Sequence, residues 1–227
     1  MQPNSIILAS KSPRRQYLLK EIGVDFLVKT KELAEDFPEH LQAEQIPLYL
    51  CELKANSFNE ELRQPNTMLI AADTIVWVNG KVLNKPENAA EAAEMLQTLS
   101  GNVHQVFTGV CLKSNFKKET FFVESKVYFN VLKPSQIEAY ISQCRPFDKA
   151  GSYGAQECLP QNFNPCSKEE IDFLKTLKKS NLIENSIRKT NDSMSFDFVK
   201  KIDGSYFNVM GLPIVELFQK INNFFSN

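Results

Sequence analysis

Apolar and polar residues alternate in blocks along this chain, and the blocks show two different periodicities. Runs that are apolar at nearly every position, such as 5–9 and 68–78, are typical of buried strands. Apolar residues three or four positions apart, as at Leu18, Leu19 and Ile22, indicate the buried face of a helix. The pattern predicts strands over 5–9, 25–30, 68–78, 81–83, 105–113 and 120–132, and helices over 13–22, 47–62, 86–99, 134–143 and 214–225.

Residues with strong local preferences place several boundaries of these elements. Ser12-Pro13 predicts a helix start, with Ser as the N-cap and Pro at the first helical position. Asn79-Gly80 predicts a two-residue hairpin turn between neighbouring strands. Strands and helices alternate throughout, and 227 residues suffice for one substantial core or at most two small ones. We expect an α/β fold in a single domain over residues 1–227.

Net charge and hydropathy limit the kinds of molecule that this chain is expected to bind. Twenty-six Lys and Arg against 27 Asp and Glu give a formal charge of −1, so no global basic field predicts a nucleic-acid partner. The first ten residues hold four consecutive apolar positions, and no run approaches the roughly 18 to 20 that a membrane span requires. Five cysteines without paired spacing are typical of reduced thiols. We expect a soluble cytoplasmic protein, a monomer or homodimer, without a membrane or stable nucleic-acid partner.

The segment from Ser10 to Arg15 places hydroxyls, free backbone N–H groups and two guanidiniums where a strand leads into a helix. A helix N-terminus attracts anions, and the planar donors of Arg can bind two phosphate oxygens at once. The alternative is a capped helix with solvated arginines, and local evidence leaves both interpretations open.

Two further positions carry candidate chemistry. Asp73 lies inside an apolar strand, where an ionised carboxylate is costly unless it is paired or binds metal. It is therefore either a site residue or an Asp that bonds to a neighbouring backbone. The loop over 148–156 contains two glycines and mixed charge, which is typical of a ligand-binding loop but also of a structural excursion.

The order and spacing of these motifs along the chain resemble those of the Maf family. Its members, also called septum-formation inhibitor proteins, are nucleotide pyrophosphatases. The resemblance covers residues 5–157 and about 202–218. It implies a two-lobed α/β fold with a mixed twisted sheet, similar to inosine triphosphate pyrophosphatases, and a nucleotide-binding cleft. The matching strings are Ile7-Leu8-Ala9-Ser10-Lys11-Ser12-Pro13-Arg14-Arg15, Ala72-Asp73-Thr74, Lys85-Pro86, Leu99-Ser100-Gly101, Asp148-Lys149-Ala150-Gly151 and Gly211-Leu212-Pro213.

The resemblance also implies roles for individual residues. Asp73 falls at the family's general base, and Glu35 aligns with a carboxylate that holds a metal ion or water. The usual Asp-Glu pair is Ala34-Glu35 here. Together Asp73 and Glu35 would hold a divalent cation, Mg²⁺, Mn²⁺ or Co²⁺. The positions implied to contact substrate are Ser10, Arg14, Arg15, Lys54, Thr74, Lys85, Asp148, Lys149 and Gln156.

Three of these residues resemble the branch that acts on dTTP and UTP: Arg14, Thr74 and Gln156, where another branch has Trp, Gln and Glu. An amide such as Gln156 can meet both a carbonyl and the N–H of uracil or thymine. We therefore expect a hydrolase of acid anhydrides that converts UTP and dTTP to monophosphate and pyrophosphate, an activity that would also remove non-canonical nucleotides. The alternatives are the same chemistry on another modified or methylated nucleotide, or a non-enzymatic regulator of cell division that binds nucleotide or nucleic acid.

Residues 158–201 depart from the family pattern, because a much shorter connection is usual there. The segment is polar and rich in Lys, Asn and Ser, with one amphipathic run over 168–179. We expect an insertion that is either a solvated surface excursion or a lid over the cleft.

Overall fold

A computed structural model of the protein describes residues 5–187 and 196–225. These residues form two compact units, each of which is described by itself. Unit 1 comprises Met1–Thr74, Phe107–Val123 and Gly211–Asn227, and unit 2 comprises Ile75–Val106 and Glu124–Met210. Three long strands contribute residues to both units: β3 (Thr67–Val78), β5 (Val103–Lys113) and β6 (Lys118–Phe129).

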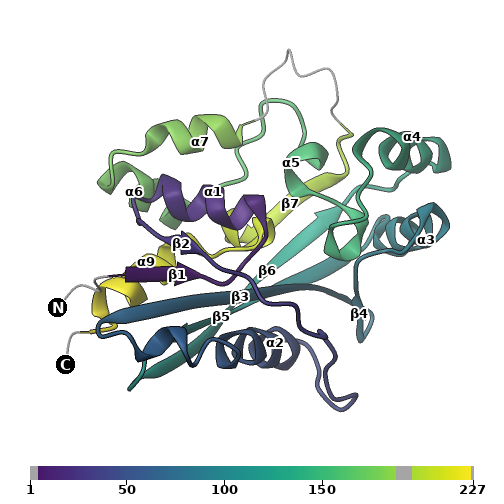
Figure 1. The fold of residues 1–227 in the computed structure, drawn as a ribbon. Helices are drawn as coiled ribbons and strands as arrows, with labels where there is room; N and C mark the ends of the chain where they lie inside the picture. The colour runs from purple at the N-terminus through teal and green to yellow at the C-terminus, as the bar shows by residue number, and fades with distance from the viewer. Residues whose placement is uncertain (1–4, 188–195, 226–227) are drawn as a thin grey trace. The chain divides into compact units, whose positions relative to one another are not determined.

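The strands form a seven-stranded sheet in the order β2-β1-β3-β5-β6-β7, with β4 paired to β3 (Figure 1). β1 (Ser5–Leu8) runs parallel to both β2 (Leu27–Val28) and β3. β4 (Lys81–Leu83) pairs antiparallel with β3, and β7 (Val199–Gly204) pairs antiparallel with β6. The sheet is therefore mixed, and the predicted α/β fold is confirmed.

In unit 1, helix α2 (Gln45–Asn56) packs directly on the sheet. Alternate residues of a strand face the same side, so Leu69, Ala71 and Asp73 of β3 share one face. Leu69 and Ala71 join Cys51 and Ala55 of α2 in one buried cluster. At Gly109 of β5 an added Cβ would lie 2.5 Å from the Pro47 carbonyl oxygen, so this glycine permits the close approach. The face that carries Asp73 is therefore the one that α2 covers.

Two other helices complete unit 1: α1 (Pro13–Glu21) and α9 (Ile214–Asn223), with a short 3-10 helix η1 (Glu61–Arg63). Figure 1 shows α1 and α2 on opposite sides of β1 and β3. This two-sided cover agrees with the continuous burial of these strands, since every residue from Thr67 to Asp73 is buried.

Unit 2 surrounds its part of the sheet with short helices. Helix α3 (Ala89–Leu99) contacts both α4 (Pro134–Cys144) and the 3-10 helix η2 (Ala150–Ser152). The chain then forms α5 (Ala155–Cys158), α6 (Lys168–Thr176), α7 (Ser180–Ser186) and α8 (Tyr206–Met210).

Several predicted boundaries were wrong for local reasons. Helix α3 begins at Ala89 rather than at 86, because the Asn88 side chain caps it by accepting from the Glu91 N–H at 3.0 Å. Helix α2 ends at Asn56 rather than at 62, and the chain continues through turns into η1. Strand β6 ends at Phe129 rather than at 132.

Residues 158–201 are only partly solvated, and residues 188–195 of this range lie outside the described residues. Glu170 of α6 is 1% exposed, and its carboxylate accepts hydrogen bonds from the Ser205 hydroxyl at 2.6 Å and from the Phe207 N–H at 3.0 Å. Leu174, Leu182 and Phe198 are also buried. The described part of this segment therefore anchors helix α8, and a fully solvated excursion is excluded for it.

Two further features concern the helices and the cysteines of the described residues. None of their helices is long and apolar enough to cross a membrane. All five cysteines lie within the described residues and are thiols rather than disulfides.

Candidate active site

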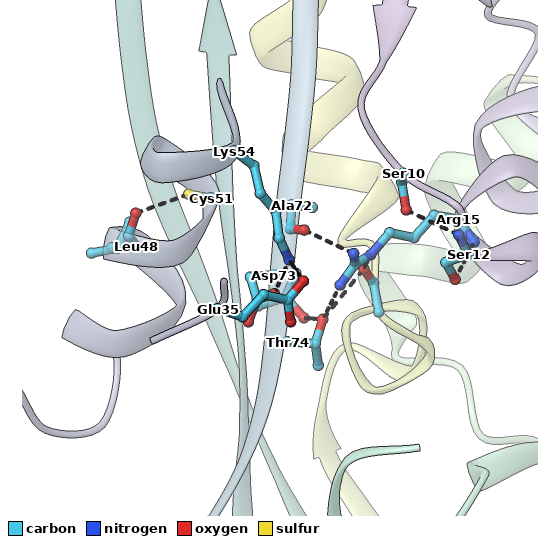
Figure 2. Close-up of polar contacts among 12 residues, drawn as sticks. Ser10, Ser12, Arg15, Glu35, Leu48, Cys51, Lys54, Ala72, Asp73 and Thr74 are labelled. Carbon is cyan, nitrogen blue, oxygen red and sulfur yellow. Dashed lines mark hydrogen bonds and ion pairs between the residues drawn. The ribbon is translucent and has the colours of Figure 1, made fainter. Parts of the chain in front are cut away.

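Asp73 lies at the centre of a compact group of charges in unit 1. It is 7% exposed, and its carboxylate forms a short ion pair with the Lys54 ammonium of α2. The same ammonium lies 2.9 Å from Oε1 of Glu35, whose side chain is 49% exposed. Figure 2 shows Lys54 reaching from its helix to both carboxylates. One cation therefore compensates two acids, one buried and one open to solvent.

Arg15 hydrogen-bonds to the residues on both sides of Asp73 (Figure 2). Its Nη1 donates to the Ala72 carbonyl at 2.8 Å, and its Nη2 donates to the Thr74 hydroxyl at 2.9 Å. Its Nε donates to the Gly211 carbonyl at 2.8 Å. Burial lowers the pKa of the Arg15 guanidinium, against the opposing effect of Asp73, yet an arginine remains charged at neutral pH. The guanidinium fork thus ties α1, β3 and the Gly-Leu-Pro segment together.

The turn from β1 to α1 has the geometry that the sequence predicts. The Ser12 hydroxyl accepts from the Arg15 N–H at 3.4 Å as the N-cap, and Pro13 occupies the first helical position. Ser10 is 7% exposed, and its hydroxyl accepts from the Ser12 N–H at 3.2 Å. Arg14 is half-buried beside it. The helix N-terminus lies next to these groups, which suits an anion.

A divalent cation fits the donor chemistry around Asp73. Mg²⁺ is usually bound by one or two protein carboxylates together with substrate phosphates, and Asp73 and Glu35 are two carboxylates that both contact the Lys54 ammonium. No group of three or more His, Cys, Asp or Glu side chains suited to a metal occurs within the described ranges. The remaining ligands would therefore have to come from substrate and solvent.

Four predicted substrate residues belong to unit 2 rather than unit 1. Lys85 is exposed and lies two residues after the end of β4. Lys149 is 9% exposed, and its ammonium lies 2.8 Å from the exposed carboxylate of Asp148. Gln156 is exposed on α5. The other seven predicted residues, Ser10, Arg14, Arg15, Glu35, Lys54, Asp73 and Thr74, belong to unit 1.

Comparison with known proteins places this arrangement in a family. The profile described as "Maf-like protein" matches residues 5–165. The chain belongs to the Maf family. Three relatives are named dTTP/UTP pyrophosphatase: those of Bacteroides thetaiotaomicron, Porphyromonas gingivalis and Flavobacterium johnsoniae. They are 39%, 36% and 37% identical to this Maf chain, and the alignments cover 95%, 96% and 94% of it and 94%, 94% and 92% of the relatives.

Among solved structures, the Staphylococcus aureus Ham1 protein matches this Maf chain with a TM-score of 0.38 and 19% identity. The match covers 56% of the chain and 72% of the Ham1 protein.

Sequence reasoning missed several partners of the site residues in this Maf protein. The Thr74 hydroxyl forms a hydrogen bond with the Thr108 hydroxyl at 2.9 Å and accepts another from Arg15. Both bonds lie within unit 1. Arg15 and Gly211 are 196 positions apart, and no local pattern could have paired them. His104 hydrogen-bonds to Tyr153, three residues before Gln156. A single His in an apolar strand gave no functional signal.

Proposed function

We propose that this Maf protein hydrolyses UTP and dTTP to the nucleoside monophosphate and pyrophosphate. The observation that carries the proposal is Asp73, a buried carboxylate paired with the Lys54 ammonium beside a helix N-terminus. Family membership and relatives named dTTP/UTP pyrophosphatase at 36–39% identity support the same reaction.

In the proposed reaction, a water oxygen attacks the α-phosphorus, and the bond to the oxygen that bridges the α- and β-phosphates breaks. Asp73 accepts the proton that the water loses. The electron pair of the broken bond leaves on pyrophosphate. A carboxylate is suited to this role, because it can orient a water molecule through a hydrogen bond and then accept its proton.

Cationic side chains would hold the phosphates, because a triphosphate carries about four negative charges near neutral pH. We assign phosphate contacts to Ser10, Arg14, Lys54, Lys85 and Lys149, and we assign Asp148 to hold the Lys149 ammonium. Because three donors of Arg15 bond within unit 1, we assign it to hold Ala72, Thr74 and Gly211 around Asp73. A divalent cation held by Asp73 and Glu35 would offset further phosphate charge.

Base choice is assigned to Gln156, with Arg14 beside the phosphates as a second discriminating residue. Uracil and thymine present carbonyl acceptors around an N–H donor, and one amide can meet an acceptor and the donor together. An arginine only donates, so it disfavours the amino group of cytosine. Thr74, whose hydroxyl bonds to Arg15, would act on the base indirectly.

The proposed setting is the cytoplasm, with the protein as a monomer or homodimer and without a stable nucleic-acid partner. The five thiols and the formal charge of −1 agree with this setting.

The test is pyrophosphate release from a panel of triphosphates: UTP, dTTP, CTP, ATP, GTP and methylated nucleotides. Each would be assayed with Mg²⁺, Mn²⁺ or Co²⁺, and again with a chelator. We expect turnover of UTP and dTTP that the chelator abolishes. Release of single phosphates, or equal turnover of ATP, would overturn the proposal. If a methylated nucleotide is hydrolysed in preference to UTP and dTTP, the proposed reaction stands and the proposed substrate is wrong.

A further inference from the structure

Four consecutive residues of unit 2, 151 to 154, are each bonded to a different part of that unit, and we call this segment the 151–154 clamp. Its partners lie in the connection after β4, in α3, in β5 and in α4. The bonds are from the Gly151 N–H to the Asn84 carbonyl at 3.1 Å, from the Ser152 hydroxyl to the Met95 sulfur at 3.0 Å, between the Tyr153 hydroxyl and His104 Nε2 at 2.8 Å, and from the Gly154 N–H to the Tyr140 hydroxyl at 2.9 Å.

The clamp side chains Ser152 and Tyr153 and their neighbours Tyr140 and His104 are buried and neutral. Ser152 and Tyr140 are fully buried, and His104 is 1% exposed. The His104 ring packs edge-on against Tyr153 and Phe129, with ring centroids 5.4 and 5.0 Å apart. Burial lowers the pKa of His104 to about 3, so its ring is neutral near pH 7. Removing one partner of such a bond leaves a buried polar group unsatisfied, which costs more than an exposed bond would.

The backbone of the clamp is strained, so its position depends on these bonds. Gly151 has φ +66°, and an added Cβ would lie 2.9 Å from a methyl carbon of Val76. Ser152 has φ +61°, which a residue with a side chain seldom adopts. Glycine adopts the left-handed region without strain, whereas Ser152 persists there only where its surroundings hold it.

The clamp connects three of the residues that we assign to substrate. Lys149 lies two positions before it, and Gln156 lies two positions after it. Asn84, which accepts from Gly151, directly precedes Lys85. A shift of the clamp would therefore move a base-reading amide and two phosphate-binding ammonium groups together.

We propose that His104, Tyr140 and Tyr153 are positioning residues: the hydrogen bonds that His104 forms with Tyr153 and Tyr140 with Gly154 hold the 151–154 clamp, and through it Gln156 and Lys149, in place for nucleotide recognition. They act through the 151–154 clamp and contact neither the nucleotide nor the attacking water. The proposal rests on the proposed function, because Gln156 and Lys149 have these roles only if the substrate is a nucleoside triphosphate. A displacement of about 1 Å in a substrate-binding group is enough to reduce turnover strongly.

The test uses hydroxyl deletions that preserve shape: Tyr153→Phe and Tyr140→Phe in the full chain. We expect the ratio of kcat/KM for UTP to that for CTP to fall by about 2- to 5-fold, no more than removal of Gln156 itself would cause, with KM changing more than kcat. Loss of stability alone would reduce the active fraction and leave this ratio unchanged. Tyr128→Phe is the matched control: its half-buried ring lies on β6 of the same unit, beneath the Lys201 ammonium at 5.2 Å.

His104 is tested by a pair of variants. His104→Phe removes the bond to Tyr153, whereas His104→Gln retains a polar group near the position of Nε2. We expect the glutamine variant to recover part of the UTP preference that the phenylalanine variant loses. Amide hydrogen exchange gives a readout that is independent of activity: residues 151–157 should exchange faster in Tyr140→Phe than in Tyr128→Phe.

The outcomes separate this proposal from the proposed function. If the wild-type chain hydrolyses no triphosphate, the proposed function fails, and this proposal fails with it. If the wild-type chain prefers UTP, but folded Tyr153→Phe and Tyr140→Phe keep the same preference and the same exchange rates, only the positioning proposal is overturned.

Discussion

Unit 1 holds its central carboxylate with charges, whereas unit 2 holds its functional loop with neutral hydrogen bonds. Around Asp73, Lys54 supplies an ammonium, and Arg15 supplies a guanidinium that donates to the Ala72 carbonyl and the Thr74 hydroxyl. Around the 151–154 clamp, the contacts come from hydroxyls, an uncharged imidazole and backbone groups. Charges suit a site that must stabilise anions, and neutral bonds suit a loop that must keep one shape.

The largest expected effect comes from removing the carboxylate of unit 1. Asp73→Asn keeps the shape of the side chain but loses the basicity that proton transfer requires, and Lys54 retains Glu35 as a partner. We expect kcat for UTP to fall by about 100- to 10,000-fold, the usual contribution of a general base. Pyrophosphate release measures the loss, and circular dichroism checks the fold. Substantial activity in a folded variant would move the base elsewhere, with Glu35 the next candidate.

The second prediction concerns the guanidinium that spans Asp73. Arg15→Lys retains the charge but loses the planar fork, so the carbonyls of Ala72 and Gly211 lose a common donor. We expect the free energy of unfolding to fall by about 3 kcal/mol, because these partly buried bonds involve a charged donor. Urea denaturation measures it.

Arg14→Lys is the matched control for that change, because Arg14 is the preceding residue of the same helix. We expect it to cost less than about 1 kcal/mol of stability and to raise KM for UTP instead. Equal destabilisation by both substitutions would show that the Arg15 fork has no special structural role.

Signals that act over a few residues predicted elements in both units. The apolar run of β3 and the Ser12-Pro13 cap lie in unit 1, the Asn79-Gly80 turn lies in unit 2, and the predicted elements formed at all three. The position of Asp73 within an apolar strand singled it out, because a buried carboxylate needs a partner. The sequence did not identify how Lys54, 19 positions away, supplies that partner, and only the family resemblance placed it near phosphates.

Strand β7 and helices α7 and α8 could not be predicted in this way. β7 alternates poorly, and its lysines at 200 and 201 are exposed, as is common at a sheet edge. It forms because Val127 and Ile202 come opposite each other when the strand pairs with β6. The clamp depends on contacts of the same long-range kind, since His104 and Tyr153 are 49 positions apart.

The third prediction uses the neutrality of His104. Its pKa falls to about 3 in the folded protein, against 6.5 for an unperturbed histidine, so between these values the unfolded chain binds the proton more tightly. The stability contributed by neutral His104 is present above pH 6.5 and is lost as the pH falls toward 3. We expect this residue to account for about 2 kcal/mol of lost stability at pH 5. Denaturant titrations at pH 7 and pH 5 measure it.

His104→Gln does not titrate in this range, so it should lose less stability than the wild-type chain between pH 7 and pH 5. An identical loss in both proteins would assign the pH dependence to other groups.

The smallest expected effect is that of the amide assigned to read the base. Gln156 is exposed on α5, so Gln156→Ala leaves the clamp and the carboxylate of unit 1 intact. We expect the preference for UTP over CTP to weaken by about 1 kcal/mol, which is at the low end for a lost polar contact because water can replace part of it. The ratio of kcat/KM values for the two nucleotides measures the change.

Gln156→Glu sharpens this test, because a carboxylate accepts hydrogen bonds but does not donate them. The carboxylate of Gln156→Glu should repel the carbonyl oxygens of uracil. The preference for UTP should therefore fall further in this variant than in Gln156→Ala. Because neither substitution touches Asp73 or Lys54, hydrolysis itself should persist in both variants, with the change confined to the choice of base. An unchanged nucleotide profile in both variants would show that another residue reads the base, and the neutral, rigid loop of unit 2 would then need a different role.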